Sequence, residues 1–189
     1  MNPIIDALLG RRSIRRYLQK PVSKDIIDTI IHTAIWAPSS MNSQPWHFTV
    51  IDNQDMLDEI SRIAHEIKIE TGMEEHLLDV DPNSIDAHIF YKAPIVIIIS
   101  GRDDTLSPDP NVDCALAAYT AVLAANSFGL GACITDLYSG FSIQDDAAEM
   151  LNLDHHYTPY YGVALGYPDE SYPVMAPLRK SDNVSYWES

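Results

Sequence analysis

Apolar and polar residues follow one another along the chain at spacings that predict both helices and strands. An Asn-Pro pair caps a helical pattern that starts at the N-terminus and ends at Gly10. Ser23 precedes an amphipathic helix that Pro38 ends, and Asn53 caps a third helix with apolar positions to Ile67. These patterns predict three helices in the first third of the chain.

Shorter apolar runs predict strands between and after these helices, at residues 47–52, 95–99, 132–135 and 160–165. The run at 95–99 is continuously β-branched, which is typical of a strand buried on both faces. Ser142 and Asp145 resemble a capping box, which predicts a further helix through Leu151.

Residues 112–128 are predicted to form a helix with almost no charged side chains. A helix that is apolar on all sides must be covered on all sides. We therefore expect this helix at the centre of the domain or against a second subunit.

The length and composition are those of one ordinary globular domain spanning residues 1–189, with 46% apolar and 21% charged side chains and no repeat. A formal net charge of -15 disfavours attraction to nucleic acid or to an anionic membrane surface. The longest apolar run, at residues 93–100, is too short to cross a membrane, and the N-terminus lacks the order of a secretory signal. We expect a cytoplasmic protein with neither nucleic acid nor membrane as a partner.

Half of the basic side chains lie in residues 1–24, which carry a net charge of +5 in this acidic chain. Four neighbouring residues form the centre of this cluster: Arg11, Arg12, Ser13 and Arg15. Guanidinium groups and a hydroxyl together supply the charge and the directed donors that a phosphate monoester requires. In an extended segment, alternate residues point to one side, so a small phosphorylated cofactor fits better than a polymer. The alternative is a solvated basic face.

A second polar group lies in the loop that follows the second predicted helix: Pro38, Ser39, Ser40, Asn42, Gln44 and Pro45. Its hydroxyl and amide groups are neutral donors and acceptors, which suit the edge of a heteroaromatic ring. Taken alone, an ordinary polar turn explains the same residues more simply.

Other candidate sites are weaker. Cys114 and Cys133 lack metal-type spacing and are expected to be buried reduced thiols. His155 and His156 are adjacent, so they do not form a ligand face, and no metal site is expected. The chain has no GxSxG, P-loop or GxGxxG motif, so neither a serine nucleophile nor a tightly bound dinucleotide is predicted.

Four motifs, taken in order along the chain, resemble the FMN-dependent nitroreductase family: RRSIRRY, APSSMNSQPWHF, GLGACI, and GVALGYP followed by a basic pair. The resemblance implies an α+β fold in which helices flank a mainly antiparallel central sheet. It also implies an intertwined homodimer with FMN at the interface, contacted by both chains.

The resemblance further implies which residues bind FMN. Arg11, Arg12 and Ser13 match the family's N-terminal contacts, with the arginines reaching the phosphate. Arg15 would lie near the pyrimidine end of the flavin, where a cation stabilises negative charge on the reduced ring.

Further contacts are implied from three other parts of the chain. Pro38, Ser39 and Ser40 would approach the flavin from the other subunit, and Asn42 would hydrogen-bond the ring edge. The family's backbone amide near flavin N5 and its C-terminal phosphate ligands have these counterparts here: Ser139, Gly140, Arg179 and Lys180.

The implied activity is hydride transfer from NADH or NADPH through flavin N5 to a small acceptor such as a nitroaromatic or a quinone, in a ping-pong sequence. In this chemistry the flavin reacts and no protein nucleophile is needed. Two alternatives stay open. Residues 69–93 match no recognisable substrate cover, so the same fold and FMN could serve reductive dehalogenation or flavin processing. The other alternative is a non-enzymatic flavin-binding dimer.

Overall fold

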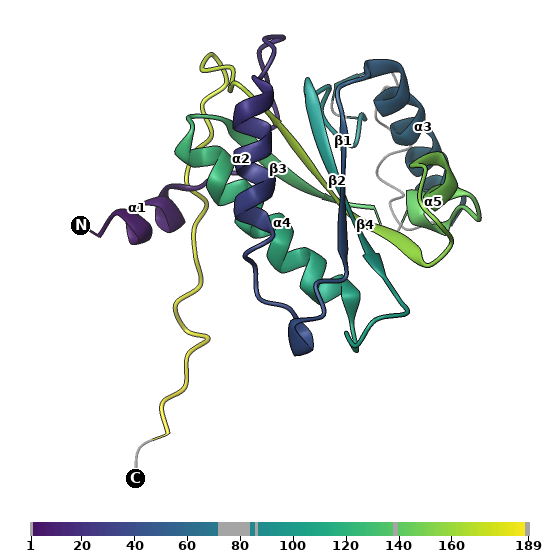
Figure 1. Cartoon of the computed structure of the whole chain (residues 1–189). Coiled ribbons are helices and arrows are strands. Elements are labelled where there is room, and N and C mark those ends of the chain that lie inside the picture. Colours follow the sequence, from purple (N-terminus) through teal and green to yellow (C-terminus); the bar gives the residue numbers. More distant parts are fainter. Residues whose placement is uncertain (1, 72–83, 86, 138–139, 188–189) are drawn as a thin grey trace.

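A four-stranded antiparallel sheet separates two layers of helices in the computed structural model (Figure 1). The structure describes residues 2–71, 84–85, 87–137 and 140–187. The strands are β1 (Trp46–Ile51), β2 (Ile95–Arg102), β3 (Gly131–Asp136) and β4 (Tyr157–Gly166), in the order β1-β2-β4-β3. All three neighbouring pairs are antiparallel, as the α+β prediction requires.

Helices cover both faces of this sheet (Figure 1). One face carries α2 (Lys24–Ala34) and α4 (Pro110–Ser127), and the other carries α3 (Gln54–Glu70) and the short α5 (Ala147–Met150). Helix α1 (Pro3–Gly10) precedes them, and two short 3-10 turns, η1 (Ser40–Asn42) and η3 (Phe141–Ile143), lie in the connections. None of the helices in the described residues combines the length and the hydrophobicity that a membrane span needs.

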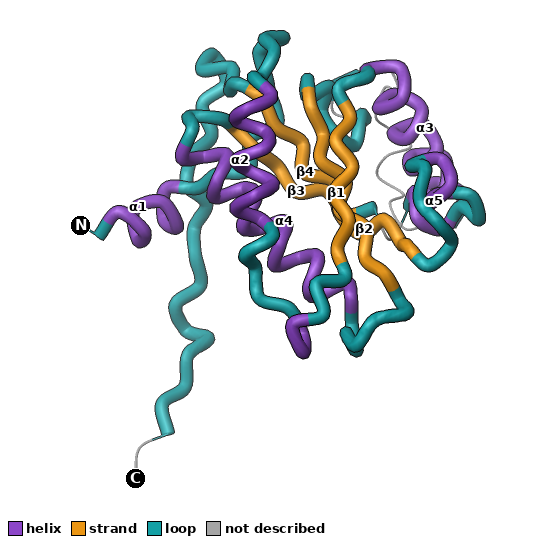
Figure 2. The backbone as a smooth tube through the Cα atoms, in the orientation of Figure 1, coloured by secondary structure: helices purple, strands orange, loops and turns teal. Residues whose placement is uncertain are grey.

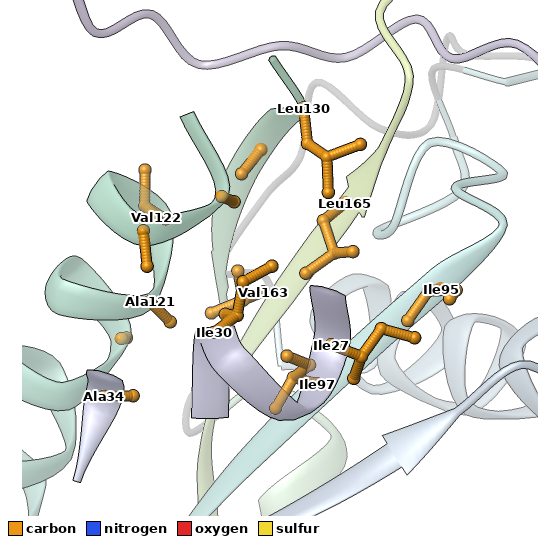
Figure 3. Close-up of a cluster of buried hydrophobic side chains, with 14 of the residues drawn as sticks. Ile27, Ile30, Ala34, Ile95, Ile97, Ala121, Val122, Leu130, Val163 and Leu165 are labelled. Atoms are coloured by element: carbon orange, nitrogen blue, oxygen red, sulfur yellow. The ribbon is translucent and has the colours of Figure 1, made fainter. Parts of the chain in front are cut away.

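Strand β2 contributes side chains to the core on both sides of the sheet, because successive residues of a strand point to opposite faces. Ile95, Ile97 and Ile99 face the α2 and α4 side, where Ile30 and Val163 complete a buried cluster (Figure 3). The small alanines of α4 allow this helix to pack close to the sheet. The strand is therefore buried on both faces, as its β-branched run predicts.

The opposite face of the sheet has its own buried cluster. Val96 and Ile98 of β2 pack there against Leu57 and Ile60 of α3, and Phe90 fills the space beside them. All five side chains are fully buried. The two clusters together fix the sheet between its helices.

Ser23 stands at the N-cap of α2, where the sequence places it, although its side chain makes no capping bond. A second capping prediction is wrong. Ser142 caps no helix: it lies within η3, and its hydroxyl donates to the carbonyl of Pro159 on β4. The bond to β4 therefore replaces the predicted capping box, and only the short α5 follows. By contrast, Asn53 caps α3 as predicted, accepting from the Met56 amide at 3.0 Å.

Both ends of the chain leave the body of the molecule. Helix α1 lies apart from the sheet, and residues 173–187 extend away as a chain without helix or strand (Figure 2). Neither segment is covered: Ile4 and Leu9 on α1 are exposed, as are Leu178 and Trp187 in the tail. These apolar side chains have no partner element within the described part of the chain that buries them.

Candidate functional site

The arginine cluster lies in an extended segment that runs beside the edge strand β3. Ser13 forms a parallel bridge with Ala132, and the Ile14 amide donates to the Ala132 carbonyl at 3.0 Å. Gly131 allows this close approach, since a Cβ there would lie 2.6 Å from the Ile14 side chain. Backbone hydrogen bonds thus hold the segment at β3, and the absence of a side chain at Gly131 leaves room for Ile14.

Tyr17 fixes the other end of this segment. Its hydroxyl is 2.5 Å from the Ile14 carbonyl and 3.2 Å from the Ala164 carbonyl on β4. Burial raises the pKa of this phenol, so it remains a neutral donor. The segment is therefore extended as predicted, with alternate side chains directed the same way.

Three members of the cluster converge on Cys133, which is buried on β3. Burial raises the pKa of the Cys133 thiol, and the Arg15 charge and a hydrogen bond to Ser13 act in the opposite direction. Arg11 also acts on the thiol, and its guanidinium carbon lies 6.0 Å from the ring centre of Tyr119 on α4. The structure thus brings Ser13 and Arg15 into hydrogen-bond contact with the Cys133 thiol, and the Arg11 charge lies near enough to act on it.

Arg15 meets an aromatic residue that the sequence pattern does not reveal. Its guanidinium carbon lies 5.5 Å from the ring centre of Tyr91. Partial burial is the largest single influence and lowers the pKa of Arg15, but the hydrogen bond to Tyr91 and the charge interactions with Cys133, Tyr91 and Tyr17 together outweigh it, so the pKa of Arg15 is raised. Arg15 therefore remains a cation at the edge of the sheet.

Tyr91 reaches Arg15 from a tight turn that a buried histidine supports. Tyr91 and Lys92 both have positive φ values, of 54° and 51°. Nδ1 of His88 accepts from the Phe90 amide at 3.1 Å and the Lys92 amide at 3.4 Å. Nε2 therefore carries the proton and donates to Asp58 at 3.1 Å, so the turn requires the neutral imidazole. Burial lowers the pKa of His88 and favours this neutral form.

Arg12 points elsewhere. Its Nη1 donates to the carbonyls of Leu9 and Arg11 at 2.8 Å, so it satisfies the C-terminal end of α1. Its predicted contact with the phosphate remains a prediction.

Carboxylates of the described residues do not neutralise the charge of the cluster. None of the ion pairs found within the described residues involves Arg11, Arg12 or Arg15. By contrast, Arg62 pairs with Glu59 and Glu66 on the surface of α3. In a chain of net charge -15, a cluster of unpaired guanidinium groups suits a bound anion. The donor set therefore fits the phosphate of FMN.

The second predicted region, residues 38–44, lies at the N-terminal end of α4. The Ser40 amide donates to Oδ1 of Asp113 on α4 at 3.0 Å. Ser39 Oγ accepts from the Gln44 amide at 3.0 Å, and Oδ1 of Asn42 accepts from the Gln44 side chain at 3.2 Å. Pro38 and Asn42 are exposed, so the loop presents polar groups to the surface.

Helix α4 carries contacts to both regions. Asp113 binds the loop and Tyr119 lies beside Arg11. These two helix positions are six residues apart, which corresponds to about 9 Å along the axis. The outer surface of α4 between and around them exposes Val112 and Leu116. The sequence predicts that this helix is covered on every side, and within one chain only its inner side is.

Three predicted contacts, at Gly140, Arg179 and Lys180, are not joined to the arginine cluster by any interaction within the described part of the chain. Gly140 is buried against α3, where an added Cβ would lie 3.4 Å from Ala64 and Lys68. Ser139 lies outside the described residues. Arg179 and Lys180 are exposed in the extended tail, and no interaction within the described part of the chain joins them to the arginine cluster.

One group with metal-binding atoms lies elsewhere, between two loops. Ligand atoms of Asp103, Asp104 and His156 lie within 4.8 Å of one another. Asp103 binds His156 at 3.0 Å, and Asp104 pairs with the Arg102 guanidinium. These carboxylates already have partners within the chain, which argues for a polar network at the surface.

Comparison with known proteins identifies relatives of this chain. The family described as "Nitroreductase family" matches residues 8–167. A protein named NADH dehydrogenase/NAD(P)H nitroreductase from Methanothermobacter thermautotrophicus is 30% identical over 171 residues, covering 89% of this chain and 78% of the relative. An FMN reductase [NAD(P)H] of Bacillus subtilis is 30% identical over 174 residues, with 89% and 67% covered.

Solved structures agree with this relationship. The crystal structure of a nitroreductase with bound FMN from Bacteroides fragilis superposes with a TM-score of 0.82 at 25% identity, and the match covers 100% of both chains. The fold and the family match over residues 8–167 agree with one another. This chain is a member of the nitroreductase family.

Proposed function

We propose that this protein transfers hydride from NADH or NADPH to a small acceptor such as a nitroaromatic or a quinone, in two alternating half-reactions on FMN. The chain is an NAD(P)H-dependent FMN oxidoreductase of the nitroreductase type. The observation that carries the proposal is the convergence of Arg11, Ser13 and Arg15 at the edge of β3, where the arginines have no carboxylate partner among the residues that the structure describes.

These three side chains would divide two roles toward FMN. Arg11 and Ser13 would hold the phosphate, because a guanidinium and a hydroxyl complement its charge and its oxygens. Arg15 would supply positive charge at the pyrimidine end of the ring. When bound, FMN would supply the hydride-accepting centre, and the protein would supply binding, orientation and electrostatics.

The working unit is a homodimer in this proposal. Apolar side chains are exposed on α1, on the outer surface of α4 and in the tail: Ile4, Leu9, Val112, Leu116, Leu178 and Trp187. Exposed apolar area that continues across several elements marks an interaction surface. A second copy would cover it, bring the partner's loop 38–42 to the flavin and carry Arg179 and Lys180 toward a phosphate.

We also propose that the protein works in the cytoplasm. Cys114 and Cys133 are both buried and unpaired. Free thiols suit a reducing compartment.

The absorbance spectrum of the purified protein tests cofactor and stoichiometry. We expect a yellow protein that releases FMN on denaturation, with one FMN for each chain. A colourless protein that takes up no added FMN would contradict the proposal.

Steady-state oxidation of NADH and NADPH with a panel of nitroaromatics and quinones tests the reaction. Parallel lines in double-reciprocal plots are expected, because the reductant leaves before the acceptor binds. A protein that binds FMN but is inert with every acceptor would point to dehalogenation or flavin processing instead. Unchanged flavin reduction in an Arg15→Met variant would favour a non-enzymatic flavin-binding dimer.

A further inference from the structure

We propose that Asp113 is a positioning residue for the flavin: its buried carboxylate holds loop 38–44 in the conformation that meets the cofactor. This inference rests on the proposed function, since it assigns a role at the same site. It concerns a residue that touches no cofactor itself and that no sequence motif marks.

The carboxylate of Asp113 is the centre of a small hydrogen-bond network. Its side chain is 1% exposed, in the first turn of α4. Oδ1 accepts from the Ser40 amide at 3.0 Å and from the Ser40 hydroxyl at 3.3 Å. Oδ2 accepts from the Ser107 hydroxyl at 2.6 Å. Both oxygens are therefore used, one by loop 38–44 and the other by the loop that leads into α4.

The negative charge of a buried carboxylate must be stabilised, and here neutral groups rather than a cation do so. No ion pair among the described residues involves Asp113, so hydrogen-bond donors and the N-terminal end of α4 must stabilise it. Two of the three donors belong to Ser40. The stability of the carboxylate and the position of the loop therefore depend on each other.

The loop needs such an anchor because its backbone is strained. Met41, Asn42 and Gln44 have φ values of 55°, 54° and 47°, which are unfavourable for residues other than glycine. Met41 is 79% exposed, so packing of its side chain does not hold this conformation. The bonds from Ser39 and Asn42 to Gln44 lie within the loop itself. Among the described contacts, the bonds from Ser40 to Asp113 tie the strained turn to the helical layer.

The chemistry of the loop tells which part of the flavin it would meet. Ser39 and Asn42 are neutral, whereas the cationic groups gather at Arg11 and Arg15 beside β3. The loop therefore suits the ring and its polar edge, and the arginines suit the phosphate. A change at Asp113 should weaken FMN and riboflavin equally, because the two ligands share the ring and differ only in the phosphate.

Flavin titration of the full-length apoprotein tests this inference. Asp113→Ala removes all three acceptor contacts and is expected to weaken both FMN and riboflavin about tenfold or more. Asp113→Asn keeps an acceptor for the Ser40 amide and should lose about threefold or less. In Asp113→Ala, the absorbance bands of the bound flavin should also shift toward those of free flavin. Asp25→Ala, in the exposed first turn of α2, is the matched control and should bind like the wild type.

The outcomes separate this inference from the function on which it rests. If wild-type protein binds no FMN, the proposed function fails and this inference fails with it. If wild-type protein binds FMN and a folded Asp113→Ala variant binds both flavins equally well, only this inference is overturned. Loss of FMN affinity without loss of riboflavin affinity would also overturn it. Should Asp113→Ala not fold, Ser107→Ala removes one support of the carboxylate, and unchanged affinity in that variant would count as refutation.

Discussion

The two regions assigned to the flavin are held in place in different ways. Segment 11–17 lies along β3 through backbone bonds and through the space that Gly131 leaves for Ile14. Loop 38–44 has three residues with positive φ and is tied to α4 by the carboxylate of Asp113. The first region is charged with a relaxed, extended backbone, and the second is neutral with a strained one.

This difference shows how a binding site divides its tasks. Charge recognition tolerates some movement, because a guanidinium group attracts a phosphate over several ångströms. Hydrogen bonding to a ring edge depends on short distances and on angle, so its loop must be held more rigidly. In the proposed site, the strained backbone and its buried anchor would provide that rigidity.

The largest effect should come from removing charge in the first region. In Arg11→Ala, FMN affinity is expected to fall about a hundredfold, because a charged contact to the phosphate is lost. Riboflavin affinity should change less than twofold. Fluorescence titration measures both. Arg62→Ala on the surface of α3, which removes a guanidinium already paired with Glu59 and Glu66, is the control and should leave both affinities unchanged.

A second test removes the close contact between Ile14 and Gly131 that lets segment 11–17 lie against β3. In Gly131→Val, the new side chain would collide with Ile14, and the free energy of unfolding should fall by about 2–3 kcal/mol. Urea unfolding measures this value. Gly10→Ala places a methyl group where nothing lies within 4 Å, so it should be neutral or slightly stabilising. Equal stability of the two variants would show that Ile14 and Gly131 do not need close contact.

A third test addresses the strained loop. Met41→Val puts a β-branched side chain at a φ of 55°, and we expect a loss of about 1–2 kcal/mol in the free energy of unfolding. Met41→Gly relieves the same strain and should remain within about 0.5 kcal/mol of the wild type, because the freer unfolded chain offsets the gain. If valine were tolerated as well as glycine in thermal unfolding, the loop would not be held in this conformation.

The smallest effect is a pH dependence at the turn that carries Tyr91. Burial lowers the pKa of His88, so the unfolded chain takes up a proton more readily than the folded chain. This contribution to stability is fully present above the unfolded value of about 6.5 and is lost as pH falls toward the folded value. Asp58 accepts from His88, and Lys92 pairs with the same carboxylate. Burial opposes the charge of Asp58, but the hydrogen bonds from Lys92, Gln54 and His88 outweigh it and lower the pKa of this carboxyl group, so Asp58 stays charged in that range.

Urea unfolding between pH 7.5 and pH 5 measures this dependence. A His88→Asn variant, which cannot take up a proton, should show a flatter profile over that range than the wild type. Identical profiles would mean that His88 does not contribute to the pH dependence.

Much of the fold follows from local patterns. Asn53 caps α3 and the β-branched run becomes β2 because both depend on neighbouring residues and on burial alone. The prediction for Ser142 is wrong because its hydroxyl finds the Pro159 carbonyl, a partner 17 residues away that no local spacing reveals.

The candidate site also contains residues that local patterns predict and residues that only the fold reveals. Alternation in an extended segment predicts that Arg11, Ser13 and Arg15 share one side, and they meet at Cys133. Tyr91 was missed because the turn that carries it depends on the distant pair of His88 and Asp58. Asp113 was missed too: in sequence it resembles any acidic residue in the first turn of a helix, and only the fold brings it to Ser40.

The two buried cysteines can report on local unfolding of the chain, because each reacts only when its surroundings open. Burial raises the pKa of Cys114 to about 12 and also raises that of Cys133, so neither thiolate is available to alkylating reagents in the closed fold. One lies within the helical layer and the other under the arginine segment. Their rates of alkylation would therefore report separately on loosening of the interior and on detachment of the N-terminal segment from the sheet.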